Sequence, residues 1–190
     1  SIIDSQGVLS NAPLFFVSPG QVNLLIPATV AEGNATLLIQ PYILGQAQPP
    51  SFADITIARV TPGLFVVDAT SLVAANVIRV KASGQQIAES PYRVDAGILQ
   101  PVAVDLGPEG ENIVLVLYGT GIRNRTSLNQ VRVTIGGITI DPAYAGTQGE
   151  FPGLDQVNVT VPRSLAGRGS VNVTVTVEGQ TSNAGRIVIK

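Results

Sequence analysis

Short runs in which apolar and polar residues alternate constrain the fold of this chain more than any other feature. The clearest is residues 171–177, Val-Asn-Val-Thr-Val-Thr-Val, in which every second residue is valine. Side chains of a strand point alternately to its two faces, so this run predicts a strand with one buried face. Residues 131–135 repeat the pattern, and Gly136-Gly137 before residues 138–140 predicts a tight hairpin turn. We therefore expect an all-β fold.

An internal repeat predicts two copies of one β module. Residues 21–27, Gln-Val-Asn-Leu-Leu-Ile-Pro, recur at 156–162 as Gln-Val-Asn-Val-Thr-Val-Pro. In each copy a small loop with a glycine follows, and then an alternating run. Pro13 upstream corresponds to Pro142 in the second copy. Self-similarity of this kind is the signature of a repeated structural unit.

The two copies are unequal in length. The second reads as seven strands, the number expected of an immunoglobulin-like sandwich, and the first only as the last five of them. The seven predicted strands lie near residues 101–106, 112–118, 130–135, 138–144, 154–161, 170–177 and 185–190. Alignment of Pro13 with Pro142 matches Ile2 with Val131, so residues 102–130 have no counterpart in the first copy. A sandwich without two strands exposes core and an unpaired sheet edge, which proteins cover or pair.

The predicted architecture is two tandem immunoglobulin-like β-sandwiches joined by a β-rich connector. Residues 1–61 form the incomplete N-terminal module, residues 62–100 the connecting β segment, and residues 101–190 the C-terminal sandwich. Two sources for the missing strands remain open. The sequence slightly favours an internal source, residues 62–100, which contain several short apolar runs. The external source is a strand from a preceding domain or from a neighbouring copy.

A low content of charge favours burial of additional surface against a partner. Only 13% of the residues are charged, against about 25% in an ordinary soluble domain, and the mean hydropathy is positive. We therefore expect a homo-oligomer or a covalently linked neighbouring domain. The chain begins at Ser1 without a basic and apolar leader, which suggests a processed product or a segment of a longer protein.

The composition excludes several classes of site. The chain has no Cys and no His, so it can form no disulfide, no thiolate or imidazole metal site and no Ser-His-Asp triad. With 11 Lys and Arg against 13 Asp and Glu, it lacks the basic surface that nucleic acids require. The longest apolar run, at residues 113–117, is far too short to span a membrane. We predict no catalytic, cofactor-binding or metal-binding residues, and therefore no enzyme.

Two polar motifs allow both a functional and a structural interpretation. The Gln-Val-Asn motif at residues 21–23 and 156–158 would suit a ligand, but its presence in both copies favours a structural role for the amides. Gly119-Thr120-Gly121 resembles part of a phosphate-binding loop. No helix is expected to follow it, so a tight turn at the end of a strand is the better interpretation.

The acidic and lysine residues would allow metal, hydrolytic or cross-link chemistry. Asp105, Glu109 and Glu111 would suit calcium or the carboxylate pair of a glycosidase, although a polar loop between strands explains them better. Lys81 and Lys190 are the only lysines, so a Lys-Asn isopeptide bond of the kind found in adhesins would involve one of them.

The basic and aromatic residues would allow binding of a polymer. Arg123, Arg125 and Arg132 would suit an acidic polymer, but a solvated face or ion pairs with nearby carboxylates explain them better. Carbohydrate binding would need exposed aromatic rings, and the chain has no Trp. The remaining candidates are Tyr42, Tyr92 and Tyr144.

Several motifs in a fixed order give the chain a resemblance to a known family. They are residues 12–23 (Ala-Pro-Leu-Phe-Phe-Val-Ser-Pro-Gly-Gln-Val-Asn), 61–65 (Thr-Pro-Gly-Leu-Phe), 118–123 (Tyr-Gly-Thr-Gly-Ile-Arg), 153–158 (Gly-Leu-Asp-Gln-Val-Asn) and 181–183 (Thr-Ser-Asn). Over nearly all of its length the chain resembles the Solibacter-type uncharacterised C-terminal domain family. The resemblance implies a secreted bacterial module, with more protein before the Phe-Val-Ser-Pro-Gly-Gln motif, and no assigned activity or catalytic residue.

These observations predict a non-enzymatic structural or interaction protein, extracellular or at the cell surface. We expect it to assemble with copies of itself or with upstream domains by strand pairing and apolar burial. The alternative is a carbohydrate-binding or adhesion module appended to a secreted protein. A hydrolase ranks third, because no pair of proton-transfer groups stands out.

Overall fold

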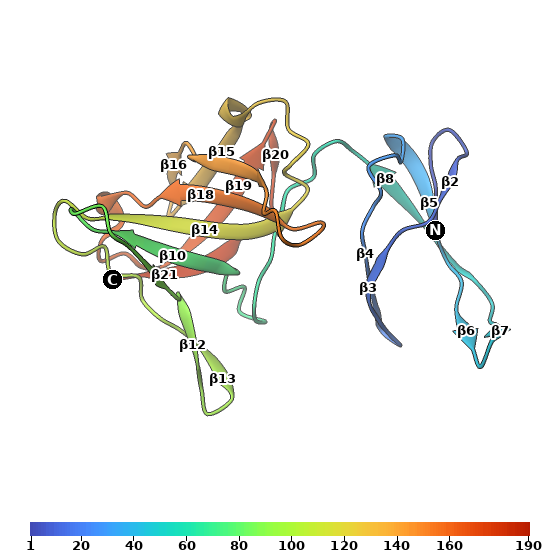
Figure 1. The fold of residues 1–190 in the computed structure, drawn as a ribbon, viewed down its shortest axis with the longest axis horizontal. Helices are drawn as coiled ribbons and strands as arrows, with labels where there is room; N and C mark the ends of the chain where they lie inside the picture. The colour runs from blue at the N-terminus through green and yellow to red at the C-terminus, as the bar shows by residue number, and fades with distance from the viewer. The chain divides into compact units, whose positions relative to one another are not determined.

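The structure, a computed structural model that describes all of residues 1–190, is all-β (Figure 1). Two short 3-10 helices, Leu128–Gln130 and Arg163–Leu165, interrupt the strands, and neither approaches the length of a membrane-spanning helix. The chain forms two compact units, called here the first unit (Ser1–Arg59) and the second unit (Val60–Lys190).

The second unit consists of two antiparallel sheets around one core. The six-stranded sheet has the order β11 (Gln86–Glu89), β10 (Ala75–Val80), β14 (Asn112–Thr120), β18 (Asp155–Thr160) and β17 (Tyr144–Thr147), with β9 (Gly63–Leu64) paired to β14. The five-stranded sheet has the order β16 (Ile138–Ile140), β15 (Val131–Ile135), β19 (Gly169–Val177) and β20 (Gln180–Thr181), with β21 (Gly185–Ile189) paired to β19. Buried residues of both sheets, including Leu115, Val157, Val133 and Val175, form one hydrophobic cluster.

The strongest sequence patterns form the predicted elements. The valines at 173, 175 and 177 of β19 are completely buried, and the intervening polar residues are partly exposed. The hairpin between β15 and β16 turns at Gly136 and Gly137, whose φ angles of 55° and 84° favour glycine.

Two details of the predicted strands differ. The strand predicted at residues 101–106 is absent beyond Pro101, where β13 (Ile98–Pro101) ends, and Val104 forms only an isolated parallel bridge with Ile189. The predicted strand at residues 138–144 is two strands, β16 and β17, which pair in different sheets. Asp141-Pro142-Ala143 separates them and carries the chain from one sheet to the other.

Residues 62–100, expected as a separate connector, contribute strands to the second unit. β9, β10 and β11 all lie in the six-stranded sheet, and Ala75 and Val77 of β10 are buried in its core. β12 (Tyr92–Asp95) and β13 pair only with each other. The strands β9, β10 and β11 therefore do not supply the missing strands of the first module, because the alternating apolar residues of β10 fit the core beside β14.

The first unit has one sheet, two hairpins and a small core. Its four-stranded sheet has the order β2 (Leu9–Ser10), β1 (Ile2–Ile3), β5 (Gly33–Ile39) and β8 (Ser51–Ile57), and its hairpins are β3 (Leu14–Ser18) with β4 (Gln21–Leu24) and β6 (Tyr42–Ile43) with β7 (Gln46–Ala47). The buried core cluster consists of Ile2, Val30, Ala35 and Ile57.

The two units repeat one arrangement of strands. The order β2-β1-β5-β8 in the first unit corresponds to β16-β15-β19-β21 in the second, and the hairpin β3–β4 corresponds to β17–β18. The first unit has no counterpart of β10 or β14. The repeat in the sequence is therefore a repeat in structure, and the shorter copy lacks two adjacent strands of one sheet.

The exact match of Ile2 differs from the sequence alignment. Ile2 pairs with Leu37, the fifth residue of β5, and Ile135 pairs with Val173, the fifth residue of β19. Both β5 and β19 begin with glycine, so the two pairs occupy equivalent positions. Ile2 therefore corresponds to Ile135, and the expected match with Val131 is wrong. Residues 4–8 connect β1 to β2, whereas Gly136-Gly137 alone connects β15 to β16, so counting back from Pro13 loses the register.

Candidate functional site

The β4 strand is paired along one side only. Its counterpart β18 lies between β17 and β14, whereas β4 pairs with β3 alone. An edge strand presents unpaired backbone N–H and C=O groups to any strand that can align with it. Natural edges are protected by charged side chains, proline or bulges. β4 (Gln-Val-Asn-Leu) contains neither a charged residue nor proline.

Side chains at equivalent positions differ in burial between the units. Val157 of β18 and its partner Ala145 of β17 are completely buried. The corresponding pair in the first unit is Val22 and Val17, of which Val22 is half-buried and Val17 is 64% exposed. The β3–β4 hairpin therefore lacks the cover that β14 gives to its counterpart.

The β3–β4 hairpin also exposes an apolar surface. Leu14, Phe15, Phe16 and Val17 follow one another in β3, and all four are exposed. A bulge interrupts the pairing between Leu14 and Phe16, but Phe16 and Val17 pair regularly with β4 and point to opposite faces, so both faces of β3 are apolar and open. Contiguous exposed apolar surface on a folded domain marks an interaction site.

A hollow of about 840 Å³ lies between this hairpin and β5. Its apolar lining includes Leu14, Val17, Val22, Leu24, Leu37 and Ile39. In the second unit the equivalent interior contains side chains of β14, among which Leu115 and Leu117 are completely buried. The hollow is therefore core space that the first unit does not fill with its own residues.

The Gln-Val-Asn motif makes the same side-chain hydrogen bond in both units. Gln21 Nε2 donates to Asn23 Oδ1 at 2.7 Å, and Gln156 Nε2 donates to Asn158 Oδ1 at 2.8 Å. The first bond lies in an edge strand and the second in the middle of a sheet. A bond that survives this change of surroundings supports the structural interpretation of the motif.

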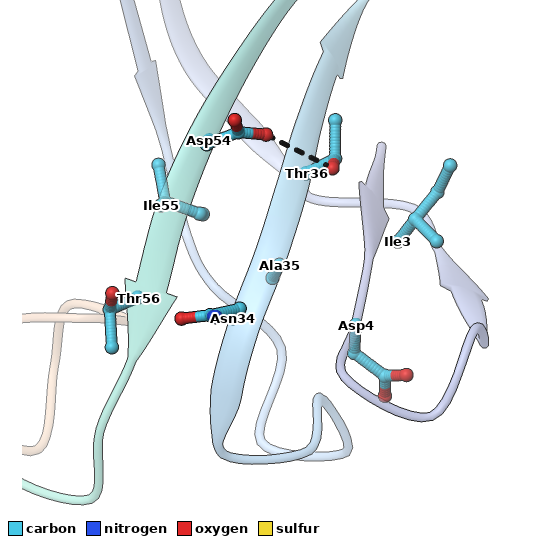
Figure 2. Close-up of a pocket in the computed structure, with 8 residues that line it drawn as sticks. All are labelled: Ile3, Asp4, Asn34, Ala35, Thr36, Asp54, Ile55 and Thr56. Carbon is cyan, nitrogen blue, oxygen red and sulfur yellow. Dashed lines mark hydrogen bonds between the residues drawn. The ribbon is translucent and has the colours of Figure 1, made fainter.

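A second, polar hollow of about 500 Å³ lies on the first unit (Figure 2). It is lined by Ile3, Asp4, Asn34, Ala35, Thr36, Asp54, Ile55 and Thr56. Figure 2 shows Thr36 on β5 next to Asp54 on β8, where the hydroxyl donates to the carboxylate at 3.4 Å. The other polar residues that β5 and β8 contribute to this hollow are Asn34 and Thr56, an amide and a hydroxyl.

Asp4, the other carboxylate of this hollow, binds backbone N–H groups. It accepts hydrogen bonds from the N–H groups of Ala31 at 3.0 Å, Val8 at 2.9 Å and Gln6 at 3.0 Å. These bonds, with Ala31 and Val8 contributing most, hold the pKa of Asp4 below its usual value against the opposing effect of burial. Asp4 therefore fixes the loop after β1.

Two of the three acidic residues that would suit a metal ion, Asp105 and Glu111, contact cations instead. Lys190 Nζ lies 2.8 Å from Asp105 Oδ2 and, with the backbone N–H of Gly107, holds the pKa of Asp105 below its usual value. Glu109 is exposed. No group of three or more His, Cys, Asp or Glu side chains is placed to hold a metal ion.

Glu111 belongs to a half-buried charge cluster on β10 and β11. Its carboxylate lies 2.8 Å from Lys81 Nζ and 3.1 Å from Arg79 Nη1, and these two cations, Lys81 first, hold the pKa of Glu111 below its usual value. Arg79 also pairs with Glu89 at 2.6 Å. Both lysines of the chain thus contact carboxylates rather than an asparagine, the partner that the isopeptide hypothesis required.

The three arginines considered for polymer binding have separate surroundings. Arg123 Nε lies 2.6 Å from Asp155 Oδ1, and Arg132 Nε lies 3.1 Å from Asp141 Oδ1. Arg125 has a buried Nε without a partner. The ion pairs of two of the three support the structural interpretation of these residues.

The Gly119-Thr120-Gly121 motif permits a close approach of backbone. A Cβ atom at Gly119 would overlap the carbonyl oxygen of Gly63, and one at Gly121 would overlap that of Thr61. Thr61 N–H donates to the Gly121 carbonyl at 3.1 Å, and β9 pairs with β14 at Gly119. The glycines therefore hold residues 61–64 against β14, and no helix N-terminus follows them.

An amide clamp that the sequence did not reveal completes this region. Asn183 Oδ1 accepts from Leu64 N–H at 2.9 Å, and Asn183 Nδ2 donates to the Leu64 carbonyl at 3.1 Å. Three of the motifs on which the family resemblance depends, at residues 61–65, 118–123 and 181–183, thus meet. A separation of 119 residues between Asn183 and Leu64 leaves no local signal for this contact.

The tyrosines considered for sugar binding are dispersed. Tyr42 is exposed on β6 of the first unit, while Tyr92 and Tyr144 belong to β12 and β17 of the second unit, which are not paired. The Tyr144 hydroxyl donates to the Thr147 carbonyl at 2.5 Å, which ties the ring to its own strand.

Comparisons of the chain with protein-family models, curated proteins and solved structures find no match. The resemblance to the Solibacter-type domain family stays a prediction from the motifs. The candidate functional site is accordingly defined by geometry: the open edge of β4, the exposed apolar residues of β3 and the adjoining hollow.

Proposed function

We propose that this protein is a non-enzymatic structural or interaction module of the cell exterior. It assembles with copies of itself or with neighbouring domains by strand pairing and apolar burial. The observation that carries the proposal is the contrast between β18, paired on both sides, and its counterpart β4, paired on one. An uncovered core and an unprotected edge in the same place indicate a surface that is covered in use.

The proposed fold is two tandem immunoglobulin-like sandwiches, the first without two strands. In such sandwiches one sheet has the order A-B-E-D and the other contains C, F and G, with C′ beside C in extended forms. The orders β10-β14-β18-β17 and β16-β15-β19-β21 support this assignment for the second unit. By the same assignment the first unit retains C′, C, D, E, F and G and lacks A and B.

The free energies of burial and of association indicate why strand pairing has to accompany apolar burial. Full burial of one exposed Val, Leu or Phe side chain contributes roughly 1.5–3 kcal/mol. Covering three or four side chains of β3, which are 49–64% exposed, therefore contributes roughly 2–8 kcal/mol. Association costs about 4–15 kcal/mol in lost translational and rotational freedom. The two quantities are of similar size. Stable assembly therefore also needs the backbone hydrogen bonds of the β4 edge or several contacts per copy.

Sedimentation velocity over a wide range of concentrations, combined with electron microscopy, tests the proposal. We expect the full chain to form oligomers or filaments whose population rises with concentration. Val17→Asp places a charge on the uncovered face and should shift the protein towards monomer. Leu44→Asp, a change at the 98% exposed tip of the β6–β7 hairpin, is the matched control and should leave assembly unchanged. A monodisperse monomer at millimolar concentration would contradict self-assembly.

A carbohydrate-binding or adhesion module is the alternative function. The observation in its favour is Tyr42, which is exposed and lines the larger hollow next to polar residues such as Gln40 and Ser51. An exposed ring beside hydrogen-bonding groups suits a sugar face. Binding on a glycan array that disappears with Tyr42→Ala but persists with Tyr144→Ala would favour this function over assembly.

A further inference from the structure

We propose that the β12–β13 hairpin of a second copy covers the β3–β4 hairpin of the first unit. This inference rests on the proposed function and names the two surfaces that meet. Figure 1 shows the β12–β13 hairpin projecting from the two sheets of the second unit. Its two strands pair only with each other, so both of its outer edges lack strand partners.

The hairpin has one apolar face. Residues directly opposite in an antiparallel pair share a face of the sheet. One face carries Tyr92, Val94, Leu99 and Pro101, and the other carries Arg93, Asp95, Ile98 and Gln100. Val94, in the middle of the apolar face, is 70% exposed. A two-stranded hairpin is at best marginally stable by itself, so an uncovered apolar face on one is a surface that gains from a partner.

The hairpin matches what the first unit lacks. The second unit shows what covers this module: two adjacent antiparallel strands, β14 against β18 and β10 beyond it. The β12–β13 hairpin supplies two adjacent antiparallel strands, and each has four residues, as β4 has. One strand of the hairpin can therefore pair with the whole β4 edge while the apolar face lies over the hollow beside Val17 and Val22.

The charges on both surfaces agree with this contact. No charged residue occurs between Asp4 and Glu32, so the receiving surface is uncharged. The only charged residues of the hairpin, Arg93 and Asp95, lie on its other face and approach each other at 3.7 Å. Pairing therefore buries no unpaired charge, which would otherwise oppose assembly.

The partner that we propose for the β3–β4 hairpin is a second copy of this chain, since every copy carries both the receiving surface and the β12–β13 hairpin. The receiving surface lies in the first unit and the hairpin in the second, so each copy offers one of each. A contact between two different surfaces is heterologous, and repetition of it produces open filaments unless a rotation closes a ring. The oligomers or filaments expected under the proposed function follow from this single contact.

Substitutions on the two faces of the hairpin test the inference. Val94→Glu places a charge on the apolar face, and Ile98→Glu places the same charge on the other face, at a side chain that is 62% exposed. In sedimentation equilibrium of the full chain we expect Val94→Glu to weaken self-association by a factor of ten or more and Ile98→Glu to change it less than threefold. Circular dichroism and thermal unfolding serve as the control that both variants remain folded.

Cross-linking identifies the contact directly, because the chain has no cysteine of its own. Copies with Asn23→Cys are mixed with copies with Arg93→Cys and treated with a short bismaleimide, and mass spectrometry identifies the linked peptides. We expect a link between positions 23 and 93 in the mixture. In the control, Leu44→Cys replaces Asn23→Cys, and no link to position 93 should form.

The outcomes separate this inference from the function on which it rests. Self-association that Val94→Glu leaves unchanged, or that Val94→Glu and Ile98→Glu weaken equally, overturns the hairpin contact and leaves the proposed assembly standing. The absence of the link between positions 23 and 93 in an associating mixture likewise overturns the hairpin contact but not the proposed assembly. A monomer at all concentrations overturns both.

Discussion

Asp155 is the buried acidic residue on which one end of the second unit depends. Its side chain is completely buried and accepts from Ile122 N–H at 2.7 Å, Arg123 N–H at 3.1 Å and Arg123 Nε at 2.6 Å. Asp155→Ala leaves the buried donors around it unsatisfied, so we expect a loss of about 3–5 kcal/mol in the free energy of unfolding. Urea denaturation measures it.

The matched control for Asp155 is an exposed ion pair. Arg132→Gln breaks the contact with Asp141 on the surface, and exposed pairs contribute about 0–1 kcal/mol. Similar losses in Asp155→Ala and Arg132→Gln would contradict the structural role assigned to Asp155.

Glu111 makes the stability of the second unit depend on pH. Its pKa is held below the ordinary 4.5 in the folded state by Lys81 and Arg79, so the unfolded chain binds a proton first as the pH falls. Its contribution is therefore complete above pH 4.5 and is lost as the pH falls through the lower, folded-state pKa. We expect unfolding midpoints in urea to drop between pH 5 and pH 3. In Glu111→Gln the midpoint should be lower at pH 7 and should fall less with acid; an equal fall in both proteins would exclude this role.

At the residue scale, the sequence predicted the positions whose partners are local. The alternation of valines in β19 and the Gly136-Gly137 turn follow from neighbouring residues alone, and both are confirmed. The clamp between Asn183 and Leu64 connects distant parts of the chain, and a lone Asn carries no sign of its partner. The sequence indicated a turn at Gly119 but not the strand that lies against it.

At the element scale, the close approach of β9 to β14 depends on Gly119. Gly119→Ala inserts a Cβ atom against the Gly63 carbonyl oxygen, so β9 must move away. Overpacking of this kind costs about 1–3 kcal/mol. We expect a lower melting temperature for the second unit, measured by calorimetry. Gly20→Ala, at a glycine with no heavy atom within 4 Å and no positive φ, should change it little. Equal effects would show that the approach is not tight.

The sequence predicted where strands occur, but it could not predict which sheet each strand joins. The alternation of β10 indicates one buried face and leaves open which core receives it. The gap in the first copy suggested that residues 62–100 would enter it. Of their strands, β9 and β10 pair with β14, because β14 offers β10 a long partner edge, from Asn112 to Leu117, within the same unit.

At the scale of the whole molecule, the two units should differ in protection from exchange. The core of the first unit contains far fewer buried residues than that of the second. Local opening is easiest where few apolar contacts resist it. In hydrogen–deuterium exchange of dilute protein we expect the amides of β5 and β8 to exchange much faster than those of β14 and β19.

Measuring exchange at several protein concentrations distinguishes a first unit that is unstable by itself from one that only lacks a covering partner. Binding to the folded state raises apparent stability, so protection of β4 and β5 should increase in concentrated, assembled protein, while that of β19 stays constant. Protection of β4 that is already high at nanomolar concentration would show that the first unit needs no partner.

The open β3–β4 hairpin links the lifetime of a copy to its incorporation. A segment with few buried apolar contacts opens locally at low cost, and proteases cleave such opened segments when a chain stands alone. Once a neighbour lies over it, the cleavage sites around Phe15 and Phe16 are shielded. Under the proposed assembly we therefore expect isolated copies to be cleaved at the β3–β4 hairpin faster than incorporated ones, which limited proteolysis of dilute and concentrated protein would measure.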